Sequence, residues 1–302
     1  MPRSLLLVTM VVVGALLGLQ ARINGELGAH LHSAIAAALV SFAGGTVLLA
    51  LLLGTRRAGL RRLRAASTKW WWWLGGLGGA AVVGGTAQGV PQIGVALVSV
   101  CIVAGMAAGA LGVDAAGLGP GTREAVSGWR LAGAVLAVVA VLLGALGDRH
   151  GAVRPALFAL LFGAGVAAAV QQAANGRIRV AAGDAIVAAF VSFLGGTVVL
   201  AIAAVAAGQL DDGSWPSSWW LYLGGPAGVI YITLAAAAVH EFGVLRLSLA
   251  TVAGQLIGAV LLDVTWPAPG TSLRAATVVG TALTMVAVAI SAVDRRRATA
   301  GG

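Results

Sequence analysis

The sequence predicts an all-α integral membrane protein with ten transmembrane helices, arranged as two inverted five-helix repeats with both termini in the cytoplasm. Three observations support this prediction: an apolar composition, ten long and mostly apolar runs, and a sequence repeat that relates the two halves. The repeats are expected at residues 1–150 and 151–302. No cofactor and no metal are expected, and the expected partners are the lipid bilayer and a small-molecule solute.

Composition excludes most other classes of protein. Of the 302 residues, 59% are hydrophobic and 10% are charged, whereas a soluble domain carries about a quarter charged residues. The same apolar excess excludes a disordered chain. A formal charge of +9 would indicate a nucleic-acid partner for a soluble protein, but this composition cannot form a soluble surface, so no nucleic acid is expected. A lone cysteine, Cys101, excludes an intrachain disulfide.

A transmembrane helix needs about 20 mostly apolar residues, because its backbone must satisfy its own hydrogen bonds within the bilayer. Ten mostly apolar runs of about that length are present, at residues 4–21, 34–53, 71–90, 93–112, 128–146, 155–173, 185–207, 218–239, 243–262 and 274–292. Seven of them carry no charge, and the other three contain one arginine each near the start of the run: Arg130, Arg246 and Arg274. The first run resembles the apolar part of a signal peptide, but no clear small-x-small cleavage site follows it. We therefore expect it to be a retained helix.

The orientation follows from the lysines and arginines of short loops, which collect in the cytoplasm. With the N-terminus inside, 15 of the 19 basic residues are cytoplasmic, and those outside are Arg22, Arg149, Arg154 and Arg274. Tryptophans agree with this placement, because Trp70 to Trp73 fall at an inner span end and Trp215, Trp219 and Trp220 at an outer one. We interpret them as interfacial anchors rather than as a ligand cage.

The two halves of the chain resemble each other. Residues 37–47 (AALVSFAGGTV) match residues 188–198 (AAFVSFLGGTV) at nine of eleven positions, with an offset of 151. After a two-residue gap the match continues at an offset of 149, which pairs Asp114 with Asp263. Each half contains five predicted spans, and because five is odd, the halves must lie in opposite orientations. Inverted repeats are characteristic of secondary transporters.

Four stretches resemble the YdcZ-type family of the drug/metabolite transporter superfamily. They are LQxxxNG from Leu19, VSFxxGT from Val40, WWxxLGG from Trp70 and VAGQLxxxxLLD from Val252. The resemblance implies two fused five-span units and the activity of an inner-membrane exporter, in a family whose substrates are mostly unassigned. The chain departs from internal symmetry at Met106, whose counterpart in the second half is Gln255.

Polar residues within apolar spans are the candidates for substrate binding, because such groups face the bundle interior or a wet cavity. Gln20 and Asn24 lie four residues apart on one helix face, and Gln171 and Asn175 repeat the arrangement. Their neutral amides suit a polar solute that must later be released. The two asparagines are each followed by glycine and fit helix ends equally well.

Five further residues complete the expected substrate-binding set: Ser41, Gln88, Gln172, Ser192 and Gln255. The two serines precede Gly-Gly-Thr motifs, a pattern that also fits close helix packing without a ligand. Packing is the favoured interpretation of these motifs and of the glycine runs that begin at Gly75 and Gly224.

None of the ten acids lies in the middle of a predicted span. His240 and Glu241, between the runs 218–239 and 243–262, are the best titratable pair for proton coupling, although an interfacial ion pair is the favoured interpretation. Small multidrug-resistance exchangers of the same superfamily use an acid in their first span, and residues 4–21 contain none. We therefore expect export of a small neutral or zwitterionic metabolite or drug-like solute by alternating access.

Two other classes compete with a transporter. An enzyme would need a nucleophile or metal constellation, and the four histidines offer none at suitable spacing, so no enzymatic activity is expected. The alternative function is a non-transporting membrane assembly or a lipid-handling protein. The sequence leaves open the solute, the direction of transport, the coupling ion and whether a homodimer forms.

Overall fold

The computed structural model describes residues 3–54, 57–120, 126–146, 155–209 and 215–300, with all their side chains except those of 3–7, 10, 145–146, 232–249 and 291–300. Within these ranges the regular structure is entirely helical. Four stretches are long and apolar enough to cross a membrane: Ala34–Leu53, Trp70–Ala115, Pro155–Ala182 and Ala185–Ala206. The predicted all-α class is confirmed.

All the described helices except α3 overlap the predicted spans. In the first half they are α1 (Arg3–His30), α2 (Ala34–Leu53), α3 (Arg57–Ala65), α4 (Gly75–Ala115) and α5 (Gly128–Leu146). In the second half they are α6 (Pro155–Ala182), α7 (Ala185–Ala206), α8 (Gly224–Thr265) and α9 (Ala275–Ala300). Short 3-10 segments, Trp70–Leu74 and Trp219–Tyr222, precede α4 and α8.

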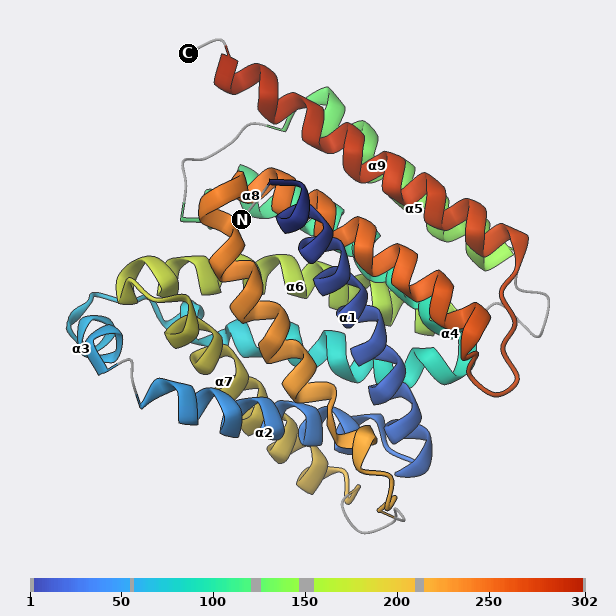
Figure 1. Ribbon diagram of the computed structural model, residues 1–302, viewed down its shortest axis with the longest axis horizontal. Coiled ribbons are helices and arrows are strands. Elements are labelled where there is room, and N and C mark those ends of the chain that lie inside the picture. Colours follow the sequence, from blue (N-terminus) through green and yellow to red (C-terminus); the bar gives the residue numbers. More distant parts are fainter. Residues whose placement is uncertain (1–2, 55–56, 121–125, 147–154, 210–214, 301–302) are drawn as a thin grey trace.

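The helices α4 and α8 are each too long for a single crossing. They contain 41 and 42 residues, and a straight helix of that length would span about 60 Å, twice the thickness of the hydrocarbon core. In α4 the helix is broken at Gly94, whose φ of 80° and ψ of 169° suit glycine alone. Figure 1 shows both helices folding back on themselves. Each therefore contains two of the predicted spans.

Helix contacts follow the sequence repeat, in which α1 corresponds to α6, α2 to α7, α4 to α8 and α5 to α9. The helix α1 lies against α8, and its counterpart α6 lies against α4. The equivalent helices α2 and α7 contact each other, and so do α5 and α9, which run along one edge of the bundle (Figure 1). The contacts between the halves therefore occur in matching sets.

Glycines allow the closest of these contacts. A Cβ on Gly105 of α4 would overlap the carbonyl oxygen of Phe162, and a Cβ on Gly254 of α8 would overlap that of Val11. Gly254 follows Gly105 by 149 positions and Phe162 follows Val11 by 151, so the two contacts are equivalent. Lipid gives helices no hydrophobic reason to associate, and such backbone contact supplies van der Waals attraction instead.

The helices α2 and α7 begin with equivalent caps. Ser33 Oγ accepts a hydrogen bond from the Ala36 N–H at 2.9 Å, and Asp184 Oδ1 accepts one from the Ile186 N–H at 2.8 Å. Ser33 and Asp184 are 151 positions apart. Each cap satisfies a backbone donor that a helix start leaves without an intrahelical partner.

Asn24 and Asn175 do not end their helices, so the helix-end interpretation is wrong. The helix α1 continues to His30 and α6 continues to Ala182. The glycine after each asparagine serves packing instead: a Cβ on Gly25 would lie 2.7 Å from Val90 Cβ, and one on Gly176 would lie 3.0 Å from Pro120. Tertiary contact with α4 and its following turn thus overrides the local tendency of Asn-Gly to terminate a helix.

We expect Gly105→Ala to lower the melting temperature of the purified protein, because the new methyl group would overlap the backbone of α6. Overpacking of this kind costs about 1–3 kcal/mol. Gly112→Ala in the same helix is the control, since nothing lies within 4 Å of its Cβ position. Equal melting temperatures for the two variants would contradict the proposed role of the Gly105 contact.

Candidate solute-binding site

Two polar clusters lie where α1 meets the start of α8 and where α6 meets the start of α4. The first polar cluster consists of Gln20, Asn24, Ser41, Gly224 and Gly228. The second polar cluster consists of their sequence equivalents, Gln171, Asn175, Ser192, Gly75 and Gly79. Neither α8 nor α4 has a side-chain cap at its N-terminus. The structure therefore brings six of the nine predicted substrate-binding residues together, in two sets of three.

Distances to the glycines define the geometry of the first polar cluster. A Cβ on Gly224 would overlap Asn24 Oδ1 and lie 3.0 Å from Ser41 Oγ. One turn further along α8, a Cβ on Gly228 would lie 3.1 Å from Gln20 Nε2. The glycines thus leave room for the amide and hydroxyl groups against the backbone of α8. Any larger residue at Gly224 would displace them.

The second polar cluster has the same arrangement. A Cβ on Gly75 would lie 2.9 Å from Asn175 Oδ1, and a Cβ on Gly79 would lie 2.7 Å from Gln171 Nε2. The two clusters differ in one respect. Gln171 Nε2 donates a hydrogen bond to Ser192 Oγ at 2.9 Å, whereas Ser41 Oγ has no hydrogen-bond partner among the described residues.

Several polar atoms in these clusters are buried without a partner. Asn24 is 0% exposed, and neither its Nδ2 nor its Oδ1 makes a hydrogen bond with any residue that the structure describes. The same holds for Ser41 Oγ, in a residue that is 2% exposed, and for Asn175 Oδ1. A buried polar group left unsatisfied costs about 1–3 kcal/mol. A polar ligand that formed hydrogen bonds with these groups would recover part of that cost.

Aromatic and hydroxyl side chains join the two clusters. The rings of Phe42 and Phe193 lie with centroids 5.0 Å apart, and Thr46 Oγ1 and Thr197 Oγ1 are 2.8 Å apart. Each pair consists of equivalent residues from α2 and α7. A Cβ on Gly79 would lie 2.9 Å from the Phe42 ring and one on Gly228 would lie 3.4 Å from that of Phe193. The phenylalanine pair therefore links the surroundings of Gln20 in the first polar cluster with those of Gln171 in the second.

The remaining candidates lie elsewhere. Gln88 and Gln172 are exposed on the surface of the helix bundle. Gln255 is partly buried in the stretch of α8 that contacts Gly14 and Gly18 of α1. The side chains of His240 and Glu241 lie outside the described residues.

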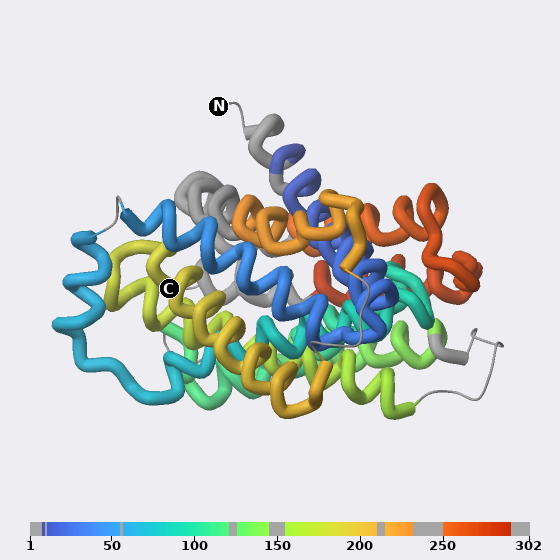
Figure 2. Tube along the Cα trace, turned by 90° about the horizontal axis from the view of Figure 1, so that it is seen from below, coloured from blue at the N-terminus to red at the C-terminus, as the bar shows by residue number. Residues whose placement is uncertain are grey.

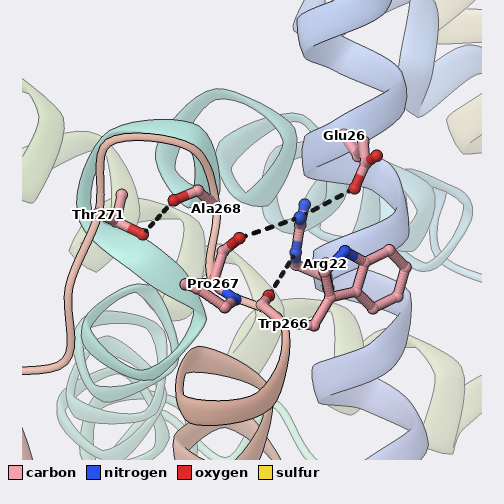
Figure 3. Close-up of polar contacts among 6 residues, drawn as sticks. All are labelled: Arg22, Glu26, Trp266, Pro267, Ala268 and Thr271. Atoms are coloured by element: carbon pink, nitrogen blue, oxygen red, sulfur yellow. Dashed lines mark hydrogen bonds and ion pairs between the residues drawn. The ribbon is translucent and has the colours of Figure 1, made fainter.

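Arg22 forms a buried group of contacts that joins α1 to the end of α8 (Figure 3). Its Nε donates to the Trp266 carbonyl at 3.0 Å and its Nη2 to the Pro267 carbonyl at 3.4 Å. The same Nη2 lies 2.9 Å from Glu26 Oε2, and the guanidinium stacks 4.7 Å from the Trp266 ring centroid. Arg22 is only 2% exposed, so these partners compensate the loss of its hydration.

Arg177 binds the equivalent carbonyls in the other half. Its Nε donates to Leu118 at 3.0 Å and its Nη2 to Gly117 at 3.1 Å. Residues 117 and 118 correspond to residues 266 and 267 at the offset of 149, whereas Arg177 corresponds to Glu26 rather than to Arg22. An arginine therefore binds an equivalent pair of carbonyls in each case. When α1 and α6 are aligned by the repeat, the two arginines lie one helical turn apart.

Asp263 holds the break in α4. Its Oδ1 accepts a hydrogen bond from the Val95 N–H at 2.8 Å and its Oδ2 accepts one from the Ala96 N–H at 2.8 Å. These two donors are freed because Gly94 interrupts the helix. The carboxylate thereby caps the second part of α4 from the neighbouring helix α8, and its charge suits the positive end of the helix dipole.

The roles of Arg22 and Asp263 are not among the predictions made from the sequence. Both lie next to span ends, where charge needs no special explanation. The repeat contained a signal, since Asp114 and Asp263 occupy equivalent positions. Asp114 instead forms an ion pair with Arg130, so the repeated acid has a different partner in each half.

These features define a multi-pass helical membrane protein built from two similar halves. Residues 5–143 and residues 156–290 each match the family described as "Putative inner membrane exporter, YdcZ". The chain belongs to this family and is located in the inner membrane. The family is a class of transporter rather than of enzyme, and the resemblance inferred from the sequence motifs is confirmed.

One solved structure, described only as the crystal structure of a protein, has the same overall fold. It is 20% identical to this chain, covers 97% of it and 98% of its own length, and superimposes with a TM-score of 0.57. At this identity the likeness concerns the fold alone. No curated protein matches the chain.

We expect Asp263→Asn to destabilise the protein by about 1.5–3 kcal/mol, because one of the two carboxylate acceptors at the break in α4 becomes an amide donor. The check is a thermal or denaturant melt in detergent. Asp184→Asn is the matched control, since asparagine caps a helix as well as aspartate does. A melt of Asp263→Asn like that of the control would show that the cap is dispensable.

Proposed function

We propose that the chain is a secondary transporter that exports a small polar, neutral or zwitterionic solute by alternating access. Its two five-helix repeats, residues 1–150 and 151–302, would lie inverted in the membrane with both termini in the cytoplasm. The two polar clusters would form the substrate-binding residues. The observation that carries the proposal is that both polar clusters contain a glutamine, an asparagine and a serine at equivalent positions. The hydrogen bonds of these side chains differ between the two clusters.

Matching contacts support an exchange between two conformations. The contact of α1 with α8 is equivalent to that of α6 with α4, and the pairs Phe42–Phe193 and Thr46–Thr197 lie between them. If the two halves exchange conformations, an opening at one face becomes an opening at the other. The described conformation would then be one of two related states.

The difference between the clusters indicates how the solute takes part. In this conformation Gln171 donates a hydrogen bond to Ser192, while Ser41 has no partner within the described part of the chain. In the exchanged conformation Gln20 would bond Ser41, and Ser192 would become free. A solute that forms hydrogen bonds with the unpartnered groups competes with the glutamine–serine hydrogen bond in only one cluster at a time. Its binding would therefore favour one conformation over the other.

The chemistry of the free groups favours a neutral or zwitterionic solute. Asn24 offers both a donor and an acceptor, Ser41 offers a hydroxyl that acts as either, and Asn175 adds an acceptor. The side chains that form the two clusters carry no charge. A solute with neighbouring donor and acceptor groups, such as a polyol, an amide or an amino acid, fits these groups.

We expect the double variant Gln20→Ala/Gln171→Ala to lose solute flux about tenfold, because each lost hydrogen bond costs about 0.5–1.5 kcal/mol. A panel of polar metabolites is first screened for thermal stabilisation of the purified protein, since a bound solute raises the melting temperature. Flux of the stabilising solute is then measured in proteoliposomes.

The matched control for this flux experiment is Gln88→Ala/Gln172→Ala, which removes two exposed glutamines. Its flux should equal that of the unchanged protein. Unchanged flux in Gln20→Ala/Gln171→Ala would remove these glutamines from the site. Failure of every solute in the panel would favour a non-transporting assembly or a lipid-handling protein.

The inverted topology predicts that equivalent loops label from opposite sides of the membrane. Ser67 and Ser217 are exposed and lie before α4 and α8 in the two halves. In a Cys101→Ala background, an impermeant maleimide added to intact cells should label Ser217→Cys but not Ser67→Cys. Permeabilised cells should show both labels. Labelling of both sites in intact cells would contradict the inversion.

A further inference from the structure

The short helix α3 carries one exposed face of arginines. Arg57, Arg61 and Arg64 follow the spacing i, i+4, i+7, which places them on one side of the helix, and all three are exposed. On the opposite side Gly59 and Leu63 are buried. This amphipathic arrangement is typical of a helix that lies at a membrane surface.

The buried side of α3 attaches it to the second half of the chain. A Cβ on Gly59 would lie 2.9 Å from Val187 Cγ2 of α7, and Leu63 packs in one cluster with Ile178 and Ala182 of α6. Both figures of the whole chain place α3 at the edge of the bundle (Figures 1 and 2). The arginine face therefore points away from the helices that hold it.

Tryptophans beside α3 place it at the height of lipid headgroups. The segment Trp70–Leu74 follows it, with Trp70 75% exposed and Trp73 45% exposed. Exposed tryptophans of membrane proteins concentrate at the boundary between hydrocarbon and headgroups. Because only a few residues separate them from Arg64, the arginines lie close to the same boundary.

The charge of this connection differs between the two halves. Residues 54–69 carry five arginines and one lysine and no acid, whereas the equivalent connection, 207–218, carries two aspartates and no basic residue. The repeat thus provides an internal comparison in which the same position in the fold has opposite charge. A packing requirement common to both halves does not explain this difference.

We propose that the face formed by Arg57, Arg61 and Arg64 binds the phosphate headgroups of anionic phospholipids. Guanidinium groups bind phosphate through paired hydrogen bonds. The anionic surface of the cytoplasmic leaflet attracts basic side chains by about 1 kcal/mol each. The bound lipid would hold α3 at the membrane surface. This inference does not depend on the transported solute.

The test compares phosphatidylglycerol with phosphatidylcholine added to the purified full-length protein in detergent. Phosphatidylglycerol should raise the melting temperature more than phosphatidylcholine does, in a dose-dependent manner. In the variant Arg57→Gln/Arg61→Gln/Arg64→Gln the apparent affinity for phosphatidylglycerol should fall about a hundredfold, as expected from the loss of three attractions of about 1 kcal/mol each.

Arg295→Gln/Arg296→Gln/Arg297→Gln is the charge-matched control, and it should keep the preference for phosphatidylglycerol. Lysine at the three α3 positions should keep most of it, which separates loss of binding from loss of folding. The proposal is overturned if the glutamine variant keeps the preference, if the control loses it equally, or if the unchanged protein has none. Equal stabilisation by inorganic phosphate would also overturn it, because the ligand would then be a free anion.

Discussion

Direct contact between helix backbones, made possible by glycine, is the constraint on which the rest of this structure depends. Between α1 and α8 and between α6 and α4, a Cβ at Gly254 or Gly105 would overlap a carbonyl oxygen of the facing helix. Helices in lipid have no water to exclude from their interface, so close van der Waals contact has to hold them together. Because equivalent contacts occur at both of these interfaces between the halves, one mode of packing serves both.

Such close packing determines where polar groups are placed. The pair α1 and α8 holds Gln20 and Asn24 against Gly228 and Gly224, and the buried amide of Asn24 has no partner among the residues that the structure describes. The charged groups, in contrast, are compensated: Arg22 reaches two carbonyls and Glu26, and Asp263 caps the break at Gly94. The unsatisfied neutral groups are available to form hydrogen bonds with a ligand. The charged groups already have partners and stabilise contacts between helices.

Much of the fold was predictable because it depends on local hydrophobicity. The apolar runs overlap helices, and α4 and α8 each contain most of two runs. Predictions about single residues were less successful. Asn24 and Asn175 were equally compatible with helix ends, yet both helices continue past them because Gly25 and Gly176 pack against neighbouring residues. Gln88 and Gln172 have the same chemistry as Gln20 and Gln171, but the structure leaves them exposed.

The sequence alone determined that the chain is helical, that it belongs in a membrane and that its halves are related, because these properties follow from composition and repetition. Tertiary structure decided which polar residues meet. Whether Gln171 bonds Ser192 while Ser41 stays unpartnered, or which backbone amides Asp263 binds, depends on how helices distant in sequence approach one another. Helical periodicity specifies a face of a helix, and only the packing of all the helices specifies what that face touches.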